Sequence, residues 1–188
     1  MEKITSLEEN IISYLALHPR RNIQQIQRGL GIQDKNYPTV RNAMPRLEKK
    51  GFVEFTQGKS EKKVVIRFYR LTAKGRGYAL AYGNSQVTLQ VPSTYENEEP
   101  QLAIFTQIST YLSTSTLLKL LRIVGKGILQ YGKDYLPNQA IAALAIEGAH
   151  LLTEKEYGEL KRACAKIPEI KARIEKAIRT LSNFSLEE

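Results

Sequence analysis

The part of the sequence that most constrains the fold is residues 36–55, NYPTVRNAMPRLEKKGFVEF. Val40, Met44 and Leu47 recur at the spacing of one helix face, while polar and basic side chains occupy the other side. Gly51 then ends the helical pattern, and the residues after it alternate as they do in a strand. The segment therefore predicts an amphipathic helix with a basic exposed face that runs directly into a strand.

The neighbouring residues predict three further helices and a hairpin. Ser6 and Asn22 are suitable N-caps for two helices that precede the segment. Residues 52–57 and 63–70 are strand-like, and the polar turn between them contains a glycine, so they predict a β-hairpin. Thr72 is a suitable cap for a helix that follows the hairpin. The predicted order is helix, helix, helix, hairpin, helix.

The second half of the chain predicts a different architecture. Residues 84–100 are polar, contain two prolines and become acidic, so we expect a linker, with a possible short strand at 87–91. Beyond the linker the pattern is helical throughout. The predicted fold is mainly α with a small β-hairpin, comprising a domain at 1–83, the linker and an all-α domain at 101–188. Its expected helices cover about 101–113, 116–131, 137–152, 154–166 and 168–182.

The net positive charge is confined to the first half of the chain. Residues 1–83 contain 16 lysines and arginines against 7 acidic residues, whereas residues 84–188 contain 12 of each. The entire net charge of +9 therefore belongs to the first domain. A compact basic unit beside a neutral one is typical of a protein that binds a polyanion.

Several function classes find no support in the sequence. The single cysteine, Cys164, allows neither an intrachain disulfide nor a cysteine-based metal cluster. There is no spacing of catalytic or metal-ligating residues, so we expect no enzyme activity, no cofactor and no metal. No apolar run has the length of about 20 residues that a membrane helix needs, and the polar start is unlike a signal peptide. We expect a cytoplasmic protein.

Residues 39–55 and the run FYRLTAKGRGYAL at 68–80 resemble winged helix-turn-helix transcriptional regulators of the MarR and PadR type. In that family a Y-x-L-T-x-K-G segment closes the wing and starts the next helix. The resemblance covers about residues 5–82 and implies a DNA-binding domain with a recognition helix and a wing. The matching positions of the Y-x-L-T-x-K-G segment are Tyr69, Leu71, Thr72, Lys74 and Gly75.

The chemistry of DNA recognition suits these residues. A helix fits the major groove, where arginine pairs with guanine and asparagine with adenine, and lysines contact phosphates. Pro45 removes one hydrogen bond, and we expect it to bend this helix without breaking it. By the family pattern, the recognition helix contributes Thr39, Arg41, Asn42, Arg46 and Lys49, and the wing contributes Lys59, Lys62, Lys63 and Arg67.

The expected function is sequence-specific binding of double-stranded DNA, as a transcriptional regulator. The family usually dimerises through a long helix ahead of this domain, but here the first predicted helix begins near Ser6. We therefore expect a homodimer formed by the helices of 101–188, a domain that could also bind an effector or a partner. Two alternatives remain, a DNA-binding replication or partition factor and a winged helix that docks on protein; some winged helices bind RNA.

Overall fold

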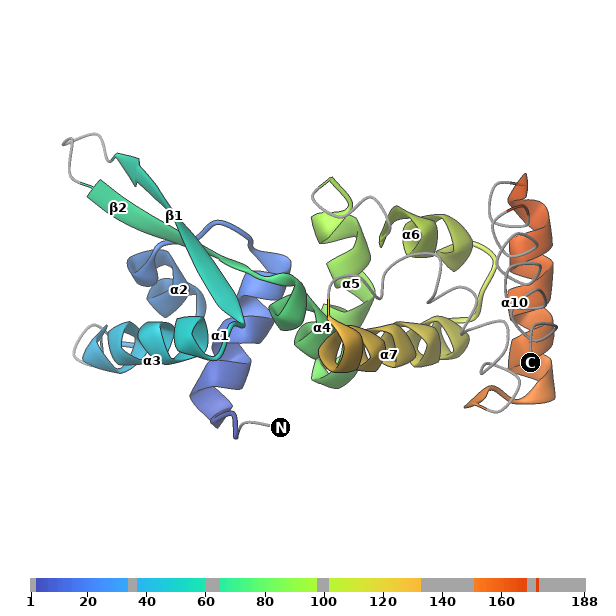
Figure 1. Ribbon diagram of the computed structural model, residues 1–188, viewed down its shortest axis with the longest axis horizontal. Helices are drawn as coiled ribbons and strands as arrows, with labels where there is room; N and C mark the ends of the chain where they lie inside the picture. Colours follow the sequence, from blue (N-terminus) through green and yellow to red (C-terminus); the bar gives the residue numbers. More distant parts are fainter. Residues whose placement is uncertain are drawn as a thin grey trace, which may run out of the picture.

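The computed structural model describes residues 3–33, 37–59, 65–97, 102–132, 151–168 and 172, with the backbone alone at 37 and 38. It is mainly helical with a two-stranded antiparallel hairpin (Figure 1). The predicted mainly-α fold with a small hairpin is confirmed. The elements are α1 (Ser6–Leu17), α2 (Ile23–Gly29), α3 (Tyr37–Lys49), β1 (Val53–Lys59), β2 (Val65–Leu71), α4 (Ala73–Tyr82), α5 (Ser85–Tyr95), α6 (Ala103–Ser109), α7 (Thr114–Tyr131) and α10 (Glu154–Lys166).

Capping residues set the starts of most helices. Helix α1 is capped by Thr5, one residue before the predicted Ser6, because Thr5 and Glu8 form a reciprocal capping box. Asn22 and Thr72 cap α2 and α4 as predicted. These caps satisfy backbone N–H groups that a helix start otherwise leaves unpaired.

The hairpin packs against the first helices through one further backbone pairing. β1 and β2 are antiparallel, with Val53 opposite Leu71 and Lys59 opposite Val65. Arg21, between α1 and α2, pairs with Tyr69 of β2 through two backbone hydrogen bonds of 3.0 and 2.8 Å. This pairing holds the base of the hairpin, by backbone hydrogen bonds, against the segment that precedes α2.

The predicted linker contains a helix instead. Within residues 84–100, Asn84 caps α5, and the strand expected at 87–91 is helical, so that prediction is wrong. Helix α5 packs against α1, α4 and α7, and the Tyr95 hydroxyl donates a hydrogen bond of 2.7 Å to the Leu15 carbonyl. Tertiary contacts therefore stabilise a helix whose polar, proline-containing sequence does not favour one.

Helices α4 and α7 cross at unusually close range. A Cβ atom at Gly125 of α7 would lie 2.6 Å from the Gly77 carbonyl oxygen and 2.5 Å from the Ala81 nitrogen. Gly125 is thus part of a tight helix–helix contact. Because α5 and α7 both pack on α4, one hydrophobic core runs from α1 across the predicted linker to α7.

The C-terminal helices agree with the sequence where the structure describes them. Helices α6, α7 and α10 fall within or close to three predicted ranges, and Thr153 caps α10. Glu159 of α10 accepts hydrogen bonds of 2.8 Å from Ser113 and Thr116 at the start of α7, which joins the two helices. The helices predicted at 137–152 and 168–182 lie almost entirely outside the described residues.

None of the helices in the described ranges combines the length and apolar composition needed to cross a membrane.

Candidate functional site

Helix α3 presents a polar and basic face to solvent. It continues through Pro45 to Lys49, so the expectation that the proline does not end the helix is confirmed. Val40, Met44 and Leu47 are fully buried, as predicted, and Ala43 joins them. All five residues predicted for the recognition helix are exposed, namely Thr39, Arg41, Asn42, Arg46 and Lys49.

These exposed residues are not equivalent in position. With about 100° of rotation per residue, Asn42 and Lys49 fall opposite the centre of the buried stripe. Arg41 and Arg46 fall on opposite edges of the exposed face. A partner that packs against the centre of the exposed face of α3 would therefore contact Asn42 and Lys49, with Arg41 on one side and Arg46 on the other.

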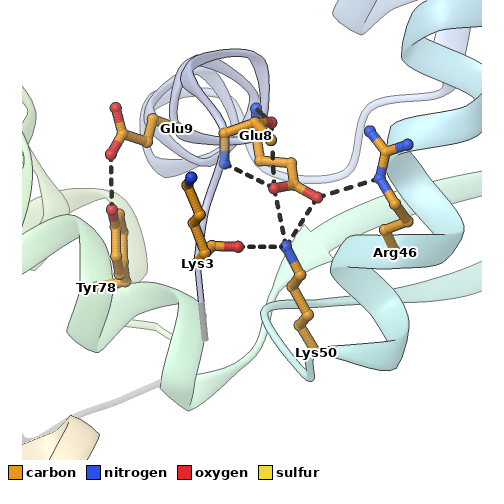
Figure 2. Close-up of polar contacts among 7 residues, drawn as sticks. Lys3, Glu8, Glu9, Arg46, Lys50 and Tyr78 are labelled. Atoms are coloured by element: carbon orange, nitrogen blue, oxygen red, sulfur yellow. Dashed lines mark hydrogen bonds and ion pairs between the residues drawn. The ribbon is translucent and has the colours of Figure 1, made fainter. Parts of the chain in front are cut away.

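The Arg46 edge of α3 is anchored to α1 by a buried carboxylate. Glu8 has no solvent-exposed surface, and its Oε1 lies 3.4 Å from Nε of Arg46 (Figure 2). Lys50, just beyond α3, donates hydrogen bonds of 3.1 and 2.9 Å to the two Glu8 oxygens and one of 2.8 Å to the Lys3 carbonyl. The Arg46 side chain is 54% exposed, so one edge contacts α1 while much of it remains accessible.

The same contacts set the acidity of Glu8. Burial pushes the pKa of this carboxyl upward, but hydrogen bonds from the Thr5 backbone and from Lys50 outweigh burial and hold the pKa below its usual value. Sequence analysis missed this residue as a site component. Its local signal was only that of an acidic residue in the first turn of a helix.

Lowering the pH should therefore reduce the free energy of unfolding, because it protonates Glu8. A depressed folded pKa means that the ionised carboxylate contributes stability above its unfolded pKa of about 4.3, and that this contribution is lost as the pH falls through the folded value. Urea unfolding at pH 7 and pH 3 should show a smaller acid-induced loss in Glu8→Gln than in the unmodified chain. Glu154→Gln, at an exposed position, serves as the control. Equal losses in the Glu8→Gln variant and the unmodified chain would contradict this assignment.

The hairpin carries two of the predicted wing residues in the described part of the chain. Lys59 at the end of β1 and Arg67 on β2 are both exposed. The Arg67 guanidinium lies 4.3 Å from the centroid of the Phe55 ring, a distance at which cation–π attraction holds the side chain along the hairpin. The other two predicted wing residues, Lys62 and Lys63, lie outside the described residues.

Within the described ranges, no group of three histidine, cysteine or acidic side chains could hold a metal ion. Cys164 is partly buried, and burial raises the pKa of its thiol. Its surroundings therefore disfavour the reactive thiolate.

Comparison of the chain with protein-family models, with curated proteins and with solved structures gives no match. The basis for a functional proposal is therefore the geometry of α3 and the hairpin together with the charge pattern of the chain.

Proposed function

We propose that this chain is a sequence-specific DNA-binding protein, a transcriptional regulator that places α3 in the major groove of duplex DNA. The observation that carries the proposal is the solvent-exposed face of α3, which gathers Arg41, Asn42, Arg46 and Lys49 opposite a fully buried stripe. Arginine and asparagine are the side chains best suited to recognise guanine and adenine in that groove.

The order of the elements supports a winged helix-turn-helix arrangement. That fold requires a particular order of elements, and the chain has this order: helix α1, the short pairing at Arg21, helices α2 and α3, and then the β1–β2 hairpin. In Figure 1 the hairpin extends beyond α2, at the end of the molecule that also contains α3. The hairpin would act as a wing, with Lys59 and Arg67 contacting the DNA backbone beside α3.

The charge distribution supports a nucleic acid as the partner. The net charge of +9 is contained in residues 1–83, to which both α3 and the hairpin belong. Phosphate contacts by lysine and arginine provide most of the non-specific affinity of DNA-binding proteins. A partner protein would not require this concentration of positive charge.

We propose a homodimer as the binding form, because one recognition helix contacts only a few base pairs and symmetric pairing doubles the contacted site. Helices α7 and α10 belong to the region assigned to self-association. A dimer of this kind would protect two half-sites related by two-fold symmetry on the selected DNA.

The proposal predicts different effects for a base contact and a phosphate contact. On a duplex selected from random sequences, Arg41→Ala should weaken binding by about 1–3 kcal/mol and relax preference at one or two bases. Lys59→Ala should weaken binding to selected and scrambled duplexes equally and reduce the slope of affinity against salt by about one. Equilibrium binding curves on both duplexes measure these effects.

Gln86→Ala, at an exposed position on α5 outside α3, the hairpin and the region assigned to self-association, is the control and should change neither curve. Docking on protein predicts no dependence on DNA sequence for any of these variants. Equal small losses on both duplexes for Arg41→Ala, Asn42→Ala and Arg46→Ala would contradict the assignment of α3 as the recognition helix.

A further inference from the structure

A cleft of about 190 Å³ lies between α1 and the junction of α4 with α5. Helix α1 contributes Glu9, Asn10 and Ser13 to its lining, and α4 contributes Tyr78 and Tyr82. The cleft is distinct from the exposed face of α3 and from the hairpin. It combines one carboxylate with two aromatic rings.

The carboxylate of Glu9 faces Tyr78 of α4 (Figure 2). It accepts a hydrogen bond of 3.0 Å from the Tyr78 hydroxyl, on the side of α1 away from the Glu8 contacts (Figure 2). Burial and this bond raise the pKa of Tyr78 to about 12, so the hydroxyl keeps its proton at neutral pH. The ion pairs among the described residues leave Glu9 without a cationic partner.

The aromatic rings complete a surface that suits a cation. Tyr78 and Tyr82 lie 5.1 Å apart between ring centroids, and Tyr82 is 50% exposed. A cation gains from the negative face of an aromatic ring as well as from a carboxylate. Ile12 and Ala79 add apolar contacts, and the amide of Asn10 adds a hydrogen-bonding group.

We propose that this cleft binds a small organic cation, with its ammonium group between the Glu9 carboxylate and the Tyr82 ring and its alkyl part against the apolar lining. The volume of about 190 Å³ is below the roughly 300–1,000 Å³ of sites for drug-sized ligands, so the ligand is an alkylammonium of few heavy atoms. This inference does not rest on the proposed DNA binding, and either can fail without the other.

The test is a titration of the full chain with n-butylammonium chloride, followed by backbone amide NMR. Saturable shifts are expected at residues that line the cleft, such as Ser13 and Asn84, and not with butan-1-ol or with potassium chloride at equal ionic strength. Glu9→Gln should weaken the binding by about tenfold or more, because glutamine lacks the charge yet keeps an oxygen for the Tyr78 hydroxyl. Tyr82→Leu should weaken it as well.

Glu154→Gln, on α10, is the matched control and should bind as the unmodified chain does. A melting curve for each variant checks that it is folded, and Tyr82→Leu provides a second test if Glu9→Gln is not. The proposal is overturned by absence of saturable shifts, by equal shifts with butan-1-ol or potassium chloride, or by unchanged affinity in folded variants.

Discussion

Replacing Lys50 by methionine should lower the free energy of unfolding by about 3–5 kcal/mol, because it leaves a fully buried carboxylate without its main cation. Lys50 makes the two shorter contacts to Glu8, whereas Arg46 approaches it only at 3.4 Å and is half-exposed. Methionine retains most of the apolar stem, so the change removes chiefly the charge. Urea denaturation at pH 7 measures the loss.

Replacing Glu8 by glutamine should lower the free energy of unfolding by less than replacing Lys50 by methionine. In Glu8→Gln the Lys50 ammonium keeps its hydrogen bond to the Lys3 carbonyl, and the Lys50 side chain is 19% exposed, so its charge is not left buried without a partner. The double variant should be more stable than Lys50→Met alone, because the unpaired carboxylate is then absent. Lys49→Met, at an exposed position, is the control. A loss in Lys50→Met no larger than in this control would contradict the role given to Glu8.

Replacing Gly125 by valine should destabilise the protein by about 3 kcal/mol or more, at the upper end of overpacking effects. The added Cβ would meet backbone atoms of α4, including the Gly77 oxygen at 2.6 Å, and backbone cannot rotate away as a side chain can. Relief requires α4 and α7 to separate, which would open the core that joins the two halves of the chain. Thermal and urea unfolding provide the measurement.

A matched glycine lies in α10. A Cβ at Gly158 would have only an ordinary contact, 3.7 Å from an Arg162 nitrogen, so Gly158→Val should change stability by no more than about 0.5 kcal/mol. Similar losses for Gly125→Val and Gly158→Val would show that the α4–α7 crossing tolerates a side chain. That result would contradict the close approach of the two helices.

The helices that sequence predicted well are those with local signals. Helix α3 is predicted by its apolar stripe and by the glycine that follows it. This glycine, Gly51, has a positive φ of 73°, as a helix-terminating glycine often does. Helix α5 has weaker local evidence, since serine, threonine and proline interrupt its apolar residues. Contacts such as Tyr95 with Leu15, 80 residues apart, could not be inferred from local patterns.

The same distinction applies to the candidate site. The exposed face of α3 followed directly from helical spacing, because burial of one stripe dictates which side chains remain outside. The contact between that face and α1 could not be predicted from helical spacing, because Glu8 and Lys50 are 42 residues apart in the sequence. The packing role of Gly125 has no local signal either, because glycine weakens an isolated helix but permits close packing of two.

The most direct test of the central claim is the binding of the full chain to duplex DNA at several salt concentrations. The proposal predicts that the logarithm of the binding constant falls linearly with the logarithm of the salt concentration. The slope should be about −4 to −6 per chain if α3 and the hairpin together neutralise about five to six phosphates. It also predicts a shallower slope when Arg41 and Lys49 are both replaced by glutamate. Absence of salt-dependent binding, or a slope unaffected by reversing these charges, would contradict DNA binding through α3.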